Sequence, residues 1–508
     1  MLDIRLFLVL AAALSAFFFR RKHDPREPPV VGSFPLIGHL IGMLWYGVSY
    51  FNLLAHKHAN LPIFSLNILG TKFHLIASPS ILQAVQRNNK TVTFDPFLQS
   101  TAERMAGISN PQTLQLLREK SSGGGGLNQT VVHALLPTLT GRPLDRMNEK
   151  MASLLSPLVD ELVEQDNQVI DLYGWCRHAI TVASTEASYG PLNPYKDAEI
   201  EDAFWNFESN MSPLLANFLP SLIARKSWTG REKAVKAFIA YYAANGHEQG
   251  SELTMARWET QHSAGLSGEE IARNEVTMGI GLLSNTVPAC FWVLYNLYAR
   301  PELLSEIRQE LATNAMIVSH ENHRIIDISA IRDACPLLLS TYQEILRYES
   351  ASAPTRFVTE DTLLQDRYLL KRGSLVNIPG ERMGWNEQVW GSSAGEFNPR
   401  RFIKSDTNNS NTRRIGAFVT FGVSPVICPG RHFATSEILG LVAMMVLRFD
   451  MFPINGWKTP KINSMAIASS MRPVQGLFNV KIVHRKEYHG SWSCRVSEGT
   501  GMFNLTVG

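Results

Sequence analysis

The sequence has few cysteines, no excess of one charge and none of the common zinc-binding patterns. Its 508 residues include 5 cysteines, which are widely spaced and odd in number; this argues against a disulfide scaffold and favours a reducing compartment. Lys plus Arg total 48 and Asp plus Glu total 45, so we expect no nucleic-acid partner. Neither a CxxC pair nor an HExxH sequence occurs, and a zinc site has no support.

The chain has enough apolar material for a large core, since 45% of its residues are hydrophobic. Helical periodicity dominates residues 45–350, with blocks at 145–165, 196–209, 267–299 and 301–315. A further apolar helix is expected from residue 430 to about Leu447, and β-like segments occur at 62–76, 355–378 and 478–484. We therefore predict one large domain that is mostly α with a small β region.

The amino terminus carries an apolar run over residues 6–19, followed at once by Arg20, Arg21 and Lys22. At about 1.5 Å per residue this run is shorter than a bilayer core of roughly 30 Å, and residues 1–5 bring it near the minimum. We expect a membrane anchor helix over residues 1–22 with a cytosolic body, because basic residues follow the run. A cleaved signal peptide is the alternative. Residues 23–40 are expected to form a proline-rich hinge, or a plain linker.

A cysteine stands in a loop shaped by Gly and Pro, FGVSPVICPG, directly before an apolar helix. Helix-terminal N–H groups stabilise a thiolate at such a position, and a thiolate there is a good iron ligand. Gly422 and Gly430 let the backbone approach a flat cofactor, and Phe421 can pack against the loop. A structural buried cysteine is the alternative for Cys428.

The segment EILR places Glu344 and Arg347 three residues apart on one helix face. Such pairs are common on exposed helices, but this one follows the apolar run PLLLSTYQ, which indicates a buried helix. A buried ion pair costs several kcal/mol to desolvate and needs further partners. The segment PRRF at residues 399–402 offers Arg401.

In their order along the chain these features resemble the cytochrome P450 family of haem-thiolate enzymes, of the microsomal type. The resemblance implies that Cys428 is the axial ligand of a haem b iron in a catalytic domain over residues 41–485. It also implies that Glu344, Arg347 and Arg401 form a structural triad. The expected location is the endoplasmic reticulum membrane, with an NADPH-dependent flavoprotein reductase as electron donor. Residues 486–508 extend past the family's usual end, and their role is unassigned.

Two departures from the family pattern concern the haem propionates. The chain has Ser424 where the family usually has Gly, and Val426 where it usually has Arg or His. That basic residue normally pairs with a propionate. Arg356 lies where the family often places another propionate-binding cation, and we expect it to bind the haem. An ordinary solvated arginine is the alternative.

The central helix, residues 276–299, contains Pro288, which cannot donate a hydrogen bond to the carbonyl of Ser284. The opened turn holds Asn285 and Thr286, where a water or dioxygen could bind; a kinked core helix is the alternative. The family commonly has an acid before the threonine, and an amide can only orient water. This pattern is similar to the branch of sterol 7α-hydroxylases and prostacyclin synthase, and the ICPGRHFA stretch is similar to fungal enzymes of specialised metabolism.

The resemblance implies a monooxygenase that inserts one oxygen atom of O2 into a hydrophobic small molecule, with Thr286 and Asn285 organising the proton-delivering water. Terpenoid, steroid-like and alkaloid substrates all remain open. One alternative is an isomerase that rearranges a peroxide on the same haem scaffold, and another is a haem-free membrane protein that keeps the fold. The apolar residues of 207–225 either dip into membrane lipid or form a core helix.

Overall fold

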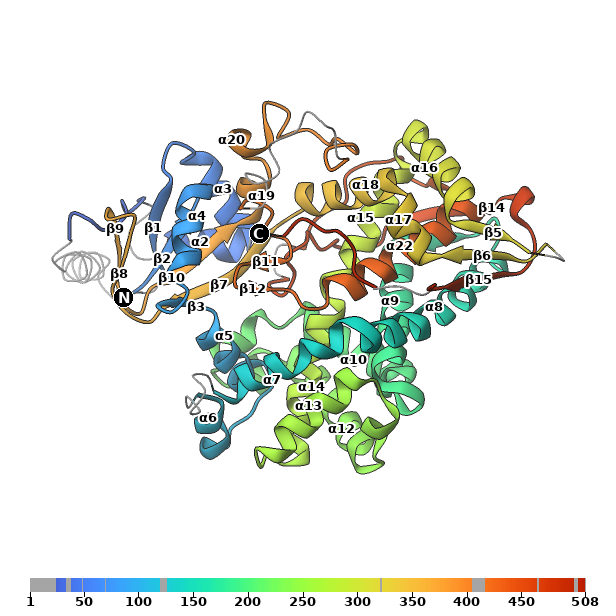
Figure 1. The fold of residues 1–508 in the computed structure, drawn as a ribbon. Helices are drawn as coiled ribbons and strands as arrows, with labels where there is room; N and C mark the ends of the chain where they lie inside the picture. The colour runs from blue at the N-terminus through green and yellow to red at the C-terminus, as the bar shows by residue number, and fades with distance from the viewer. Residues whose placement is uncertain are drawn as a thin grey trace, which may run out of the picture.

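The computed structural model describes residues 24–32, 38–47, 49–68, 70–118, 126–319, 322–403, 416–463, 466–497 and 501–507. Figure 1 shows a sheet with covering helices on one side and a larger helical body on the other. This arrangement confirms the predicted mostly α fold with a small β region. The predicted anchor over residues 1–22 lies outside the described residues.

The helices are α2 (Gly38–Tyr46), α3 (Ser49–Lys57), α4 (Pro79–Arg87), α5 (Asp95–Ser100), α6 (Pro111–Arg118), α7 (Leu127–Leu135), α8 (Gly141–Val163), α9 (Leu172–Tyr189), α10 (Ala198–Ser209), α11 (Pro220–Ile223), α12 (Arg225–Ala243), α13 (Glu252–Ser263), α14 (Gly268–Leu283), α15 (Thr286–Tyr298), α16 (Pro301–Asn314), α17 (Ile328–Ala334), α18 (Pro336–Tyr348), α19 (Gly380–Gly384), α20 (Glu387–Trp390) and α22 (Arg431–Arg448). The shorter sheets use β4 (Val169–Asp171), β5 (Met316–Val318), β6 (Arg324–Asp327), β8 (Thr362–Leu364), β9 (Tyr368–Leu370), β11 (Gly422–Val423), β12 (Val426–Ile427), β13 (Phe449–Pro453), β14 (Asn479–His484) and β15 (Trp492–Arg495).

The largest sheet brings together distant parts of the chain in the order β1-β2-β10-β7-β3. These strands are β1 (Ile63–Ile68), β2 (Thr71–Ile76), β10 (Leu375–Pro379), β7 (Ser352–Val358) and β3 (Val92–Thr93). A tight hairpin joins β1 to β2, and Gly70 takes a positive φ of 81° there, which costs a glycine little. The sheet thus places β7, which carries Arg356, beside the amino-terminal hairpin.

The proline-rich segment is partly fixed to this sheet. The Ser65 N–H donates to the Pro29 carbonyl (2.8 Å), and the Val31 N–H donates to the Ser65 carbonyl (2.9 Å). Residues 29–31 therefore run as an extended strip along β1, and Lys72 pairs with the Glu27 carboxylate. This part of the predicted hinge belongs to the body.

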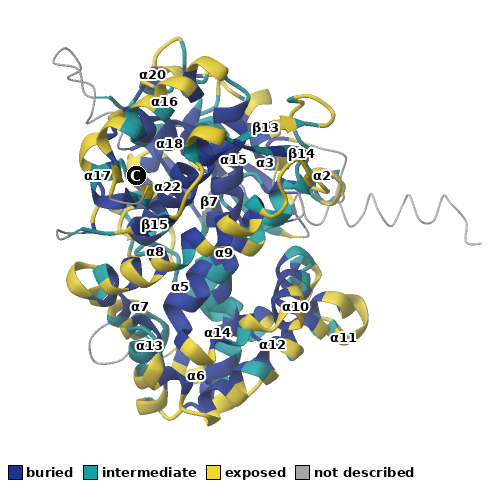
Figure 2. Ribbon diagram, turned by 90° about the vertical axis from the view of Figure 1, so that its right-hand side faces the viewer, coloured by how far each residue is buried: buried dark blue, intermediate teal, exposed yellow. Residues whose placement is uncertain are grey.

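The core lies where α8, α9, α15, α18 and α22 meet; α15 and α22 are almost entirely buried, while α8 also has an exposed face (Figure 2). The apolar sequence of α22 agrees with this position, because its residues from His432 to Arg448 are almost all buried. Among the described residues, the stretch Gly268–Tyr298 is long and apolar enough to cross a membrane, but 67% of its apolar window is buried in the body. This stretch is therefore part of the core.

The predicted long central helix is divided into α14 and α15. A capping box formed by Ser267 and Glu270 starts α14, and the helix ends at Leu283. Helix α15 starts at Thr286, two residues before Pro288, as expected from the missing proline N–H. The interruption at residues 284–285 agrees with the opened turn that the sequence predicts.

The segment 207–225 does not form one core helix. Helix α10 ends at Ser209, a short turn follows, and α11 covers only Pro220–Ile223. Phe218, Leu219, Leu222 and Ile223 are exposed, so they do not contribute to the core.

The carboxyl-terminal residues pack onto the helical body. Strand β15 pairs in parallel with β6, and Phe503 is buried in the main core cluster. The backbone N–H of Phe503 donates to His432 Nδ1 on α22 (3.1 Å), and that of Thr506 donates to Gln343 Oε1 on α18 (2.8 Å). The described residues of the tail therefore join two core helices.

Helix α22 contains a fully buried carboxyl group, Glu437, which accepts hydrogen bonds from the Ser184 hydroxyl at 2.9 and 2.8 Å. Burial raises the pKa of Glu437 to about 8, and Ser184 opposes this shift. The folded state therefore keeps a proton that the unfolded chain releases, and folding stability falls as the pH rises towards 8.

We expect Glu437→Gln to remove this dependence, because the amide does not titrate. The difference in melting temperature, variant minus wild type, should increase between about pH 5 and about pH 8. Thermal unfolding across this range measures it, and a difference that stays constant with pH would show that the carboxyl has no raised pKa.

Candidate active site

The cysteine loop is a hairpin that ends at a helix. Strands β11 and β12 pair Gly422 with Ile427, and the Cys428 N–H donates to the Phe421 carbonyl (2.7 Å). Gly422 has φ 93°, and a Cβ there would lie 2.5 Å from the Val426 carbonyl oxygen. Only glycine therefore allows this close approach of the two strands. Helix α22 starts three residues after the cysteine.

Cys428 is exposed to solvent in the loop, although protein atoms are packed around its thiol. Burial raises the pKa of Cys428, while the backbone N–H groups of Gly430 and Arg431 and the Arg431 guanidinium lower it. A metal ion would complete this environment, because coordination deprotonates a thiol outright. Gly430 has no atom within 4 Å of its Cβ position, so it leaves open space beside the thiol.

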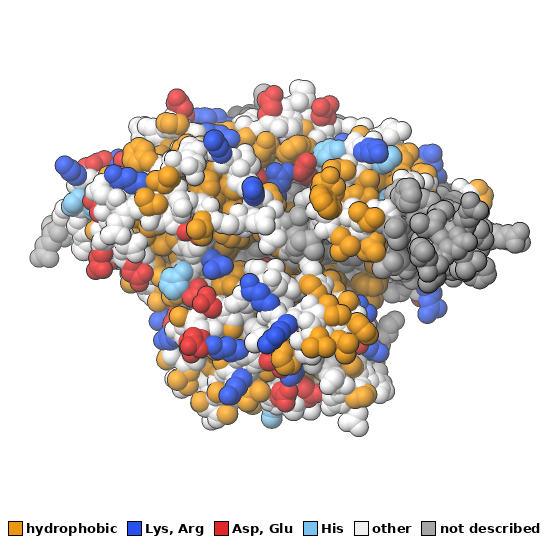
Figure 3. Space-filling model, turned by 180° about the vertical axis from the view of Figure 1, so that it is seen from behind, with side chains coloured by type: hydrophobic (Ala, Val, Ile, Leu, Met, Phe, Trp, Pro, Cys, Tyr) orange, Lys and Arg blue, Asp and Glu red, His pale blue; other side chains and the backbone are white. Residues whose placement is uncertain are grey.

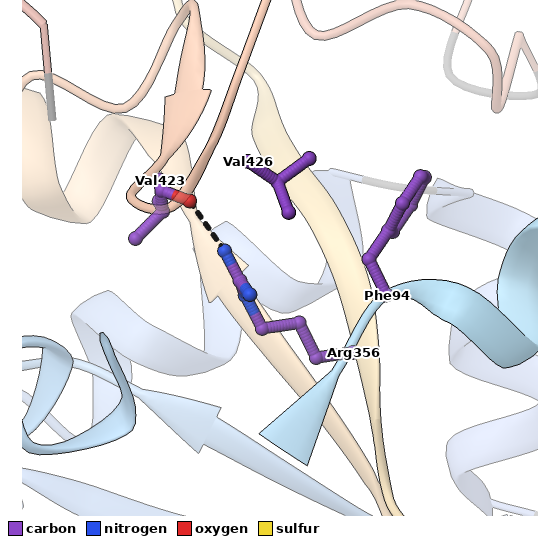
Figure 4. A pocket seen from close by; sticks show the side chains of 4 residues that line it. All are labelled: Phe94, Arg356, Val423 and Val426. Carbon is purple, nitrogen blue, oxygen red and sulfur yellow. Dashed lines mark hydrogen bonds between the residues drawn. The ribbon is translucent and has the colours of Figure 1, made fainter. Parts of the chain in front are cut away.

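A buried cation lies next to the same hairpin. Figure 4 shows the Arg356 side chain with its guanidinium directed at the Val423 carbonyl, to which Nη2 donates at 2.5 Å. Arg356 is only 3% exposed, and no carboxylate of the described residues lies within ion-pair distance of it. Burial lowers the pKa of Arg356. A buried charge without an anion is costly, so this site favours an anionic ligand.

The cavity in front of Arg356 is small and is lined by Phe94, Arg356, Val423 and Val426. Apart from the guanidinium its lining side chains are apolar, and Val426 adds no charge. A thiol just before a helix, apolar walls and a buried cation without a carboxylate partner among the described residues are together what a haem with its propionates requires. The residues present therefore fit that cofactor.

Glu344 is the centre of a fully buried charge cluster. Its carboxylate accepts from Arg347 Nη2 (2.7 Å) and Nε (2.8 Å), and from Arg401 Nε (3.0 and 3.1 Å). The N–H of Asn398 adds a further hydrogen bond at 2.8 Å. Both oxygens of the buried Glu344 carboxylate therefore have hydrogen-bond partners, which offset the free-energy cost of removing the charge from water. The structure brings together the three residues that the family resemblance implies.

The two arginines extend the cluster to the neighbouring loops. Arg347 donates to the carbonyls of Ala394 (2.7 Å) and Glu396 (3.0 Å), and Arg401 donates to that of Trp390 (3.1 Å). On the other side of α18, Thr420 Oγ1 donates to the Leu346 carbonyl (2.8 Å). Since Thr420 precedes Phe421 directly, the charge cluster and the cysteine loop share one rigid support.

We expect Arg401→Ala to lower the free energy of unfolding by about 3–5 kcal/mol, because it leaves Glu344 with an incomplete set of partners. Haem content after purification should fall with it. The matched control is Arg400→Ala, which removes an exposed pair with Glu306 worth about 1 kcal/mol or less. Chemical denaturation of both variants measures the difference in the free energy of unfolding. Equal losses in the two variants would show that the buried cluster stabilises the fold no more than the exposed pair does.

The polar residues of the central helix take different roles. Thr286 Oγ1 donates to the Leu282 carbonyl (2.9 Å), which leaves the hydroxyl oxygen able to accept. Asn285 Oδ1 accepts from the Ser470 N–H (2.6 Å) and from Ser469 Oγ (3.3 Å). The amide therefore ties the loop at residues 469–470 to the opened turn.

One polar residue near this turn is not found by the sequence analysis. Glu208 is buried, although it lies at the end of α10 and follows Phe204, Trp205 and Phe207. The aromatic residues before Glu208 were a signal of burial in the sequence, because a helix segment so rich in aromatic residues is unusual at the surface. Its partners are far away in the chain and could not be identified from local spacing.

Comparison with known proteins is consistent with these features. The sequence profile described as Cytochrome P450 matches residues 25–480. The chain is 43% identical to cytochrome P450 monooxygenase nodJ of Hypoxylon pulicicidum over 96% of both chains. It is 25% identical to cytochrome P450 7B1 of Mus musculus, covering 87% of this chain and 89% of the relative. A 25-hydroxycholesterol 7-alpha-hydroxylase of Rattus norvegicus is 23% identical, covering 73% and 90%.

Proposed function

The chain belongs to the cytochrome P450 family as one of its monooxygenases, and we propose that Cys428 is the thiolate ligand of its haem b iron. The observation that carries this proposal is the position of Cys428 three residues before α22, in the same hairpin loop as Val423 and Val426, which line a cavity together with Arg356. Arg356 would bind a propionate, and Phe421, Gly422 and Gly430 would shape the loop around the iron ligand.

When bound, the haem supplies oxygen activation, because electron donation by the thiolate favours cleavage of the O–O bond. The residues of the chain position the reactants and exclude water. Thr286 holds its hydroxyl at the opened turn through the Leu282 carbonyl and can accept a hydrogen bond from water. Asn285 fixes the loop at residues 469–470 against this turn, and together the two residues organise the water on the distal side.

The proposed substrate is a hydrophobic small molecule of terpenoid, steroid-like or alkaloid type from specialised metabolism. Members of the family generally take electrons from a redox partner and act on hydrophobic substrates. The relative named 25-hydroxycholesterol 7-alpha-hydroxylase acts on a sterol, and the chain is also similar to fungal cytochrome P450 monooxygenases. We propose an NADPH-dependent flavoprotein reductase as the electron donor.

We also propose attachment to the endoplasmic reticulum membrane. Two exposed apolar groups support it: Ile41, Leu44 and Trp45 on α2, and Phe218, Leu219, Leu222 and Ile223 at α11. Both helices lie on the same side of the molecule in Figure 2, and Figure 3 shows hydrophobic side chains gathered on that face. Exposed apolar residues of this density favour contact with lipid.

We expect Cys428→Ser to lose the red-shifted Soret band of the reduced, carbon monoxide-bound protein and to lose product formation with NADPH and reductase. Serine cannot provide the thiolate on which both depend. The control Cys335→Ser changes a buried cysteine at the start of α18 and should keep both. A Cys428→Ser variant that retains the band and the activity would refute the assignment. Product formed from a hydroperoxide without electron supply would instead indicate an isomerase.

The proposed membrane contact predicts that a tryptophan at the tip of α11 reaches the lipid. In the membrane-bound full chain, Leu222→Trp should add fluorescence that brominated phospholipid quenches, because the residue is 71% exposed on the apolar face. Leu477→Trp is the matched control, because Leu477 is similarly exposed, at 75%, but belongs to neither α2 nor α11. Equal quenching of both variants would contradict the proposed orientation.

A further inference from the structure

We propose that Glu208 is the carboxylic acid that supplies protons to the distal side of the active site, through water and the hydroxyl of Ser284. This inference rests on the proposed function. It assigns a proton source to a catalytic site whose opened turn, residues 284–286, contains no acid.

The reaction requires such a source. Insertion of one oxygen atom follows RH + O2 + 2e⁻ + 2H⁺ → ROH + H2O, so two protons are consumed for every two electrons delivered by the reductase. The residue before Thr286 is Asn285, whose amide cannot release a proton at ordinary pH. Its carbonyl oxygen is also engaged by the loop at Ser469 and Ser470. An acid must therefore come from another element.

Glu208 comes from the last turn of α10 and is only 6% exposed. Together with Ser284 it lines a small cavity formed by α9, α10, the opened turn and residues 463, 466, 473 and 474. Among the residues that line this cavity in the described part of the chain, Glu208 is the one carboxylic acid. The polar side chains in its lining give a water molecule in this cavity several hydrogen-bond partners.

Ser284 connects the cavity to the opened turn. It is only 3% exposed, and its hydroxyl lies close enough to the Glu208 carboxyl to lower the pKa of that group, but it has no partner at ordinary hydrogen-bond geometry among the described residues. Its carbonyl also lacks the usual helical donor, because residue 288 is proline. The Ser284 hydroxyl and carbonyl are therefore suitable partners for a water molecule in this cavity. Water at this position reaches both Glu208 and the turn that carries Thr286.

The surroundings of Glu208 suit a proton donor. Burial raises the pKa of Glu208, while the hydroxyls of Ser284 and Ser209 and the Arg177 guanidinium lower it. Arg177 and Tyr173, both on α9, are the charged and titratable groups that face the carboxyl in this cavity. Ser209 donates to Glu208 Oε2 at 3.2 Å. Half-buried Arg177 and Ser209 mark the side from which solvent can return the proton.

Proton transfer can be written as a closed cycle. The Glu208 carboxyl releases its proton to a cavity water, which passes a proton along Ser284 and the water at the opened turn to the oxygen being reduced. Solvent at the Arg177 side then reprotonates the carboxylate. No oxidant or reductant beyond the monooxygenase reaction is needed.

The test uses full-length holoenzyme with reductase and Glu208→Gln, which keeps the shape of the side chain and removes its proton. We expect the product formed per NADPH oxidised to fall about tenfold, with the electrons appearing as hydrogen peroxide, while haem content and the carbon monoxide spectrum remain those of the wild type. The control Asp202→Asn changes an exposed acid of the same helix and should leave coupling unchanged. Normal coupling in Glu208→Gln would overturn the proposal.

A second measurement does not depend on turnover. The infrared difference spectrum of the resting holoenzyme, wild type minus Glu208→Gln, should contain a protonated-carboxyl band that shifts in D2O, because the buried Glu437 contributes equally to both proteins and cancels. A difference spectrum without such a band would overturn the assignment. Ser284→Ala should lose coupling as Glu208→Gln does, and the double variant should lose no more. Additive losses would contradict a path through Ser284. A wild-type protein without the thiolate spectrum would instead refute the proposed function.

Discussion

The buried carboxylate of Glu344 is the constraint on which the rest of the structure depends. A carboxylate without water is stable only when its lone pairs are taken, and here two guanidinium groups and a backbone N–H take them. The same arginines also donate hydrogen bonds to backbone carbonyls of the loop over residues 384–396. These hydrogen bonds fix the position of α18 relative to this loop.

That fixed position governs both sides of the active site. The hydrogen bond from Thr420 to the Leu346 carbonyl attaches the cysteine hairpin to the end of α18. The hairpin in turn supplies the Val423 carbonyl that orients Arg356. The proposed iron ligand and the proposed propionate partner are thus held by one framework. The distal side is built differently, since it uses a helix break at residues 284–285 whose polar groups are left for water and for the neighbouring loop.

Features that depend on neighbours in the chain were predictable from the sequence. The Gly-rich cysteine loop, the spacing of Glu344 and Arg347 and the helix break before Pro288 all follow from local chemistry. Contacts between distant segments were not predictable in this way: nothing in the spacing pairs Glu208 with Ser284, Asn285 with Ser470, or Phe503 with His432. The segment 207–225 was ambiguous because apolar residues occur both in cores and on lipid-facing surfaces, and only tertiary packing decides between them.

The central claim is that a haem iron is bound to the sulfur of Cys428. X-ray absorption at the iron edge of the purified protein tests it most directly, because sulfur scatters differently from nitrogen and oxygen. The account predicts one sulfur ligand at bonding distance in addition to the four porphyrin nitrogens. An iron surrounded only by nitrogen and oxygen ligands in haem-loaded wild-type protein would contradict it.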